Sequence, residues 1–91
     1  MENGMSVTVE FFGIPRRRAG VATIELEAVA LGELFAQLAD RLPSFAQSCL
    51  EEGRLQPGYL ASINGRTFTR DATTPLRPND RVLILSADVG G

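Results

Sequence analysis

The sequence predicts one small α+β domain, in which a mixed β-sheet packs on one main helix. Apolar and polar residues alternate in two stretches near the N-terminus, and an apolar strand follows near the C-terminus. Between them, apolar residues recur with the period of an α-helix. A helix that follows a strand pair and is followed by further strands is typical of an α+β domain with the helix on one face of the sheet. With 91 residues, the chain has room for one such domain.

Two strands are expected in the N-terminal part, at 6–12 and 21–26. In each of them alternate residues are apolar, which is the pattern of a half-buried strand. A glycine and a proline end the first strand, and the stretch 16–20, Arg-Arg-Arg-Ala-Gly, is typical of a solvated loop. We therefore expect the two strands to form an N-terminal hairpin, with the three arginines at the tip of its loop.

A long amphipathic helix is expected at 31–42, because leucine and phenylalanine recur on one side at spacings of three and four residues. Pro43 would end this helix by removing an amide donor. Ser44 could cap a short second helix, which Gly53 would terminate. Cys49 lies on the apolar side of that second helix. We expect a buried and unreactive thiol there, because the chain has no histidine or lysine to lower its pKa.

The C-terminal half is expected to return to strands. A strand at 59–63 leads into a tight turn at Asn64-Gly65, since both residue types accept a positive φ, and 66–69 would pair back. The last strand, 81–85, is expected at the sheet centre beside the first strand, and its second apolar face indicates either that central position or a surface for a partner. It is apolar on both faces, with Val82 and Ile84 on one and Leu83 and Leu85 on the other.

Composition argues against several classes of function. The chain has nine arginines, no lysine and eleven acidic residues, for a net charge of −2. This balance gives no electrostatic footprint for nucleic acid or for an anionic membrane, and no apolar run approaches the ~18–20 residues of a membrane span. There is no histidine and only one cysteine, so we expect no metal site and no bound cofactor. A single cysteine also fits the reducing cytoplasm.

The remaining candidate for a chemical function is the glycine pair at the end of the sequence, Gly90 and Gly91. We find no paired carboxylates, phosphate-binding glycine loop or catalytic triad, so the sequence does not resemble that of an enzyme. Without Cβ atoms, two glycines can enter a narrow channel of another protein and leave the terminal carboxylate open to attack on ATP. From residue 85 onward the chain could span about 20 Å at ~3.3 Å per residue. A frayed terminus is the alternative.

Four stretches of the chain carry motifs that occur together in one family, and the two glycines follow them. These stretches are 7–13 (Val-Thr-Val-Glu-Phe-Phe-Gly), 31–38 (Leu-Gly-Glu-Leu-Phe-Ala-Gln-Leu), 62–65 (Ser-Ile-Asn-Gly) and 76–82. In this order the chain resembles the β-grasp sulfur carriers. This group contains the small subunit of molybdopterin synthase (MoaD) and the thiamine-pathway carrier (ThiS), and the resemblance covers nearly the whole chain. The family often has Gly-Asp where this chain has Asn79-Asp80, but asparagine accepts left-handed backbone. The family's molybdopterin branch often ends in Pro-Pro-Val-Ala-Gly-Gly, where 86–91 reads Ser-Ala-Asp-Val-Gly-Gly.

The resemblance implies a ubiquitin-like β-grasp domain at 1–85 and a flexible tail at 86–91. It also implies a non-catalytic carrier, which is activated by an adenylating partner similar to ubiquitin-activating enzymes. The partner would consume the ATP. That partner would convert the Gly91 carboxylate to an acyl-adenylate, from which sulfur would form a thiocarboxylate. In the molybdopterin branch, which we favour, a large synthase subunit would then enclose the tail. The partner's channel would recognise Gly90 and Val89. The body of the domain would dock on the partner through Leu83, Leu85 and Phe12.

Two other functions stay open from the sequence. The chain could be a ubiquitin-like modifier that is conjugated to other proteins through Gly91. Because it has no lysine, it could not form chains linked through its own side chains. It could also be a β-grasp interaction module whose glycine pair is incidental. The pathway that would receive the sulfur, molybdopterin or thiamine, is not encoded in these motifs.

Overall fold

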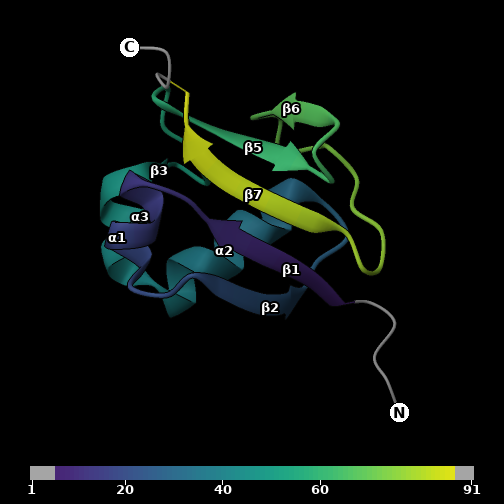
Figure 1. Cartoon of the computed structure of the whole chain (residues 1–91), viewed down its shortest axis with the longest axis horizontal. Coiled ribbons are helices and arrows are strands. Elements are labelled where there is room, and N and C mark those ends of the chain that lie inside the picture. Colours follow the sequence, from purple (N-terminus) through teal and green to yellow (C-terminus); the bar gives the residue numbers. More distant parts are fainter. Residues whose placement is uncertain (1–5, 88–91) are drawn as a thin grey trace.

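The computed structural model describes residues 6–87, which form a mixed five-stranded sheet with two helices on one face and a third at one end (Figure 1). A separate two-stranded hairpin lies beside it. The strands are β1 (Ser6–Phe11), β2 (Thr23–Glu27), β3 (Leu50–Glu51), β4 (Arg54–Leu55), β5 (Tyr59–Ile63), β6 (Thr67–Thr69) and β7 (Arg81–Ser86). The helices are α1 (Ile14–Ala19), α2 (Leu31–Arg41) and α3 (Pro43–Cys49).

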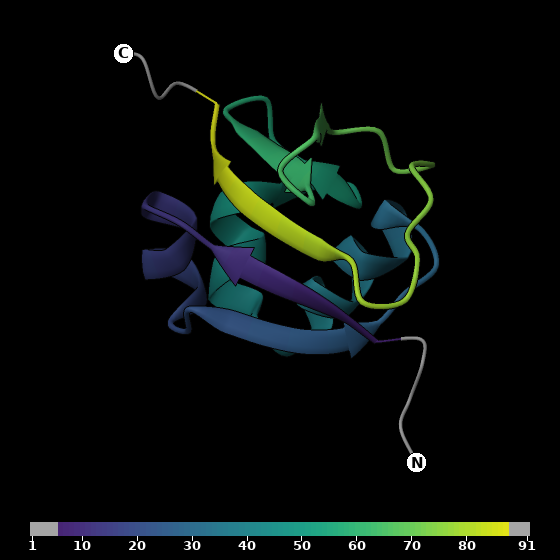
Figure 2. The ribbon, with the colours of Figure 1, turned by 45° about the vertical axis from the view of Figure 1, so that its right-hand side comes forward.

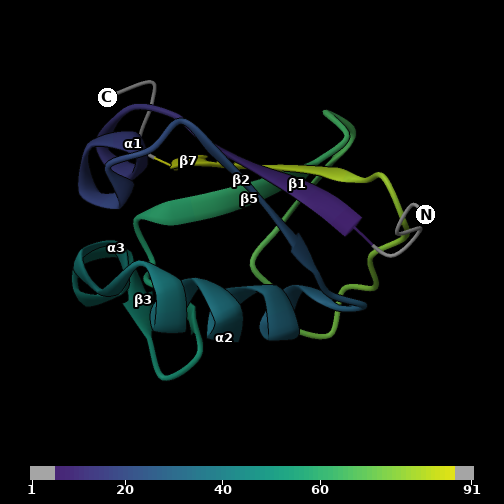
Figure 3. The same ribbon diagram turned by 90° about the horizontal axis from the view of Figure 1, so that it is seen from below.

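The sheet has the strand order β2-β1-β7-β5-β6, which places the first and last strands at its centre. β1 and β7 pair in parallel, and the other neighbouring pairs are antiparallel. α2 lies under one face of this sheet (Figure 3). This is the expected α+β class, a ubiquitin-like β-grasp with the main helix held against a mixed sheet. The expected pairing of the first and last strands is also confirmed.

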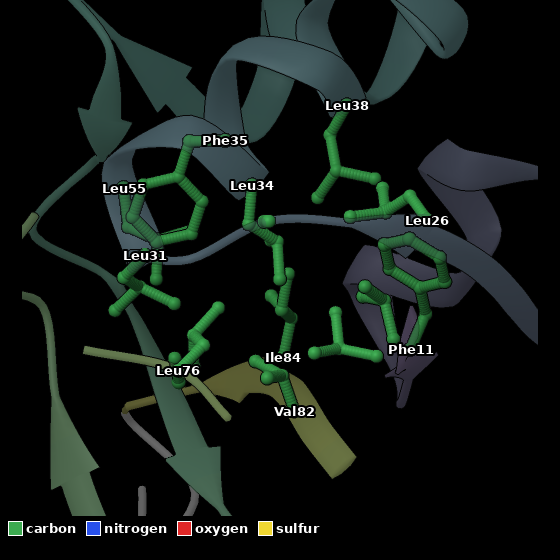
Figure 4. Close-up of a cluster of buried hydrophobic side chains, with 14 of the residues drawn as sticks. Phe11, Leu26, Leu31, Leu34, Phe35, Leu38, Leu55, Leu76, Val82 and Ile84 are labelled. Carbon is green, nitrogen blue, oxygen red and sulfur yellow. The ribbon is translucent and has the colours of Figure 1, made fainter. Parts of the chain in front are cut away.

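The core lies between α2 and the sheet. The apolar side of α2 is fully buried and points toward the inner face of the sheet, where Val82 and Ile84 of β7 are also fully buried (Figure 4). The rings of Phe11 and Phe45 meet edge to face, with centroids 5.2 Å apart. The helix therefore buries four members of the stripe expected from its spacing, Leu31, Leu34, Phe35 and Leu38. The fifth expected member, Leu42, follows the helix and is half-buried against the core.

The N-terminus of α2 is capped by backbone rather than by a side chain. The amide of Leu31 donates to the carbonyl of Thr74 at 2.9 Å, and that of Gly32 donates to the carbonyl of Ala72 at 2.8 Å. A Cβ atom on Gly32 would lie 3.1 Å from the Ala72 Cβ and 3.2 Å from the Ala72 oxygen. Glycine is required here because the loop approaches the helix so closely.

The stretch 16–20, expected to be a loop, is a helix in the structure, so that prediction is wrong. α1 begins after Gly13, which has φ 69°, and ends at Gly20, which has φ 78° and a left-handed conformation. Pro15 lies in the first turn and is buried. Glycine and proline are chain breakers, but they also mark the end and the first turn of a helix. β1 and β2 still pair antiparallel, although a helix rather than a tight loop connects them.

The second helix is shorter than expected. α3 starts at Pro43 without a side-chain cap, and it ends at Cys49 instead of continuing to Gly53. β3 and β4 follow as a small hairpin, in which Glu52 and Gly53 take positive φ values of 53° and 79°. The hairpin pairs Leu50 with Leu55 and buries both against the core.

Asn64 holds two turns of the sheet together. Its side-chain amide donates to Asp80 Oδ1 at 2.8 Å, and its side-chain oxygen accepts from the amide of Arg81 at 2.9 Å. Asn64 has φ 56° and Asn79 has φ 72°, so both accept left-handed backbone as expected. The turn after β5 contains three residues rather than two, because Ile63 pairs with Thr67.

Candidate functional site at the outer sheet face and the end of β7

The predicted tail residues Val89, Gly90 and Gly91 lie outside the described residues. The described chain leaves the sheet at Ser86, the last residue of β7, one residue beyond the boundary expected at 85. The amide of Ala87 donates to the carbonyl of Gly58 at 2.8 Å. The site can therefore be built from the end of β7 and from the surfaces around it.

β7 presents its two apolar faces as expected. Val82 and Ile84 are fully buried against α2, whereas Leu83 and Leu85 are half-buried on the opposite face. Figures 1 and 2 view the sheet from this outer side, with α2 and α3 behind it. In these views no helix of residues 6–87 lies in front of β7.

An apolar patch surrounds the two outward leucines of β7. Leu60 is directly opposite Leu85 in the β5–β7 pairing. Phe68 and Leu83 both lie opposite Ser62, one from each neighbouring strand. Phe12 follows β1, and its amide donates to the Ile84 carbonyl at 3.0 Å, which puts Phe12 beside Leu85. Side chains that are opposite one another share a face of the sheet. We call this set the outer patch: Phe12, Leu60, Phe68, Leu83 and Leu85.

Aromatic side chains are the most exposed members of the outer patch. Phe12 is 63% exposed and Phe68 is 59% exposed. Clustered exposed apolar side chains mark interaction surfaces, whereas single ones do not. The sequence pointed to Phe12, but it did not point to Leu60 and Phe68. Their membership depends on the register of β5 and β6 against β7, which no local pattern encodes.

A charged pair borders the outer patch on the side away from the end of β7. Glu10 is opposite Leu83 in the β1–β7 pairing, and the Arg81 guanidinium donates to its carboxylate. Both side chains keep contact with solvent, so the pair contributes little to stability. It limits the apolar surface to the half of the sheet from which the chain leaves.

Positive charge gathers at the same end of the molecule. Because β1 and β7 run in parallel, α1 follows β1 at the end of the sheet where β7 ends (Figure 3). α1 contacts β7, and its three arginines, 16–18, are exposed. The charge of Arg18 reaches Tyr59, and Tyr59 pairs with Ser86 at the end of β7. The sequence predicted that these arginines lie at the tip of a loop. Only the parallel pairing of β1 with β7 brings them close to the end of β7.

The single cysteine lies near this end but inside the core. Cys49 is fully buried, as expected, and its burial raises the pKa of the thiol above its ordinary value. A hydrogen bond to the Tyr59 hydroxyl and the charge of Arg18 oppose that rise without cancelling it. A buried thiol with a raised pKa is a poor nucleophile. The geometry therefore assigns Cys49 to packing and not to chemistry.

Within residues 6–87, no three His, Cys, Asp or Glu side chains come together as metal ligands. In the same part of the chain, no helix has the length and apolar character needed to cross a membrane. Among residues 6–87 the candidate site thus consists of the outer patch and the end of β7.

Several solved structures share this fold. The small archaeal modifier protein 1 of Methanosarcina acetivorans is 22% identical, over 99% of this chain and 100% of that chain, with a TM-score of 0.78. The corresponding protein of Haloferax volcanii is 17% identical, over 94% of this chain and 99% of that chain, with a TM-score of 0.77. A putative molybdopterin converting factor subunit 1 of Pyrococcus furiosus is 21% identical, over 90% of this chain and 97% of that chain, with a TM-score of 0.71.

These identities are low, so the likeness to solved structures establishes the fold. No curated protein sequence matches the chain. The sequence model of the ThiS family, however, matches residues 9–91, a stretch that begins within β1 and includes β7, the main helix and the glycine pair. The chain therefore belongs to the ThiS family.

Proposed function

We propose that this chain is a sulfur carrier that is charged at the carboxylate of Gly91. One observation carries the proposal: the outer patch and the arginines of α1 meet at the end of β7, from which the glycine pair leads. A carrier needs this combination, because its partner must hold the domain while it acts on the chain end. The family match, which extends through Gly91, supports the same reading.

The proposed chemistry takes place in two steps. A carboxylate is a poor electrophile, because its charge repels nucleophiles and oxide is a poor leaving group. In the first step a Gly91 carboxylate oxygen attacks the α-phosphorus of ATP, and pyrophosphate leaves. In the second step sulfide attacks the acyl carbon of the adenylate, and AMP leaves with the electrons of the broken C–O bond. The product is a Gly91 thiocarboxylate, a soft sulfur nucleophile at the end of the chain. Both ATP and the catalytic groups belong to the partner, and this chain binds no cofactor itself.

The partners would use the outer patch in turn. An adenylating enzyme of the ubiquitin-activating type would dock on the patch through Phe12, Leu83 and Leu85, with Val89 and Gly90 in its channel. After charging, the acceptor enzyme would occupy the same surface. For the acceptor we favour the large subunit of a molybdopterin synthase, since a neighbour in structure carries the name of a molybdopterin converting factor. ATP and reduced thiols are both supplied by the cytoplasm, where we expect the reaction.

A second candidate function is protein modification, which the structural likeness to two archaeal modifier proteins favours. In that case a lysine amine of a target attacks the acyl-adenylate, an amide forms, and AMP leaves. The chain itself has no lysine, so its own side chains could not accept a second copy. Both functions share the activation of Gly91 and differ in the nucleophile that follows.

The deciding experiment combines the purified chain with its adenylating enzyme, ATP and sulfide, followed by intact-mass analysis. A carrier shows one oxygen replaced by sulfur, and a chain that lacks Gly90 and Gly91 shows no change. Incubation with cell extract and ATP tests the second function, because higher-mass conjugates indicate a modifier. An unmodified mass under conditions that charge another member of the family would refute the proposal.

A further inference from the structure

The sheet has two edge strands, and β2 is the longer one, with five residues against three in β6. An edge strand presents alternate backbone N–H and C=O groups to which another strand can pair. The carbonyl of Ala22, just before β2, accepts from the amide of Phe11 and so points toward β1. Every second residue along β2 from Ala22 therefore also turns its backbone N–H and C=O toward β1. The backbone groups of Glu25 and Glu27 therefore point away from β1, toward the free edge.

Side chains of α2 bond to this edge. α2 follows β2 after a three-residue connection and returns alongside it, in the opposite direction. Three of its residues, each four positions from the next, reach backbone groups on β2 or just beyond its end. Glu33 Oε1 accepts from the amide of Val29 at 2.7 Å, Gln37 Nε2 donates to the carbonyl of Glu27, and Arg41 Nη1 lies 3.5 Å from the carbonyl of Glu25.

The spacing of the two elements explains the regularity of these contacts. Four residues of an α-helix advance by about 6 Å. Two residues of a strand advance by about 6.7 Å, and two residues separate consecutive outward groups. Each step along the helix ridge at Glu33, Gln37 and Arg41 therefore meets the next outward group of the strand. The longer Arg41 contact, at the far end of the ladder, fits the small difference between the two spacings.

We propose that this ladder of Glu33, Gln37 and Arg41 closes the edge of β2, so that no second copy of the chain can add a strand there. The helix takes the place of a neighbouring strand and occupies the acceptors that such a strand would need. Strand addition at this edge of the sheet is then blocked, whereas the edge of β6 is not affected. The inference rests on the edge contacts alone and does not depend on the proposed sulfur chemistry.

The side chains of β2 add a second barrier of a different kind. Glu25 and Glu27 are exposed, and their carboxylates would oppose those of a second β2 in an antiparallel pair. Like charges directly opposite one another destabilise strand pairing. Removal of one barrier alone should therefore have less effect than removal of both. This difference separates the contribution of the ladder from that of the charges.

The test uses four variants of the full chain. The first opens the ladder with Gln37→Ala and Arg41→Ala, and the second removes the charges with Glu25→Thr and Glu27→Thr. The third combines all four changes. The fourth is a matched control, Gln47→Ala with Arg54→Ala, which removes the same two residue types at exposed positions away from β2. Sedimentation velocity measures association, and amide hydrogen exchange locates it.

We expect the wild type and the control to be monomers and the fourfold variant to associate, with new protection of the Glu25 amide. The ladder variant and the charge variant should each associate more weakly than the fourfold variant. The proposal is overturned if the fourfold variant stays monomeric, or if it associates without protection of Glu25. It is equally overturned if the charge variant associates as strongly as the fourfold variant, because the ladder would then have no effect.

A measurement on the wild type keeps the proposal testable even if a variant does not fold. The side-chain amide protons of Gln37 should exchange with solvent more slowly than those of Gln47, because Gln37, unlike Gln47, donates to a strand carbonyl. Equal exchange rates for the two glutamines would contradict the ladder directly.

Discussion

The outer patch makes a sharp prediction about Phe12, the most exposed of its aromatic side chains. Full burial of a phenylalanine contributes about 1.5–3 kcal/mol to stability. Phe12 is 63% exposed, so Phe12→Ser should lower the free energy of unfolding by roughly 1 kcal/mol or less. If Phe12 is an anchor of the docking surface, the same change should weaken partner binding by more than about 2 kcal/mol, or roughly thirty-fold in Kd.

The assay is calorimetric titration of the adenylating enzyme with each variant, beside urea unfolding of the variant alone. Val29→Ser is the matched control, since Val29 is 57% exposed but lies next to the opposite end of β2, away from the outer patch. Phe12→Leu should retain most of the affinity because it keeps an apolar side chain. The reasoning is refuted if Phe12→Ser binds as the wild type does, or if Val29→Ser weakens binding equally.

Other changes test the chain end, the core and the titrating groups. Deletion of Gly90 and Gly91 should abolish sulfur transfer while the free energy of unfolding changes by less than ~0.5 kcal/mol; a deletion that melts the domain would make the chain end structural. Leu34→Ala truncates a fully buried side chain and should cost ~2–5 kcal/mol in urea unfolding, whereas the folded fraction should still be charged. Gly32→Ala should destabilise the domain by about 1 kcal/mol, since the new methyl group would press on a backbone carbonyl; equal or higher stability would contradict this close approach. Burial raises the pKa of the Cys49 thiol in the folded domain, so the thiol of the unfolded chain ionises first as the pH rises. The free energy of unfolding in urea should therefore fall above the ordinary thiol pKa of about 8.5, and it should fall less steeply in Cys49→Ala.

The elements that the sequence predicted correctly are those whose evidence is local. The helix at α2 and the strand at β7 follow from spacings within a single stretch, and the inward and outward residues of β7 follow from the same period. The errors have local causes as well. Gly13, Pro15 and Gly20 are compatible with both a loop and a capped helix. The β3–β4 hairpin was missed because burial of Leu50 and Leu55 against the core, and not a pattern within the segment, selects it.

By itself, the sequence determined the α+β class, the buried face of the main helix and the glycine pair. It also determined which residues of the last strand face the core and which face outward. These properties depend on the order and period of residues along the chain. Only the tertiary structure decided which surfaces meet. Phe68 joins Leu83, and the arginines of α1 lie beside the end of β7, because strands from distant parts of the chain pair in one register. The ladder from α2 to β2 also depends on the tertiary structure, because its side chains reach the backbone of the strand only when the helix lies alongside it.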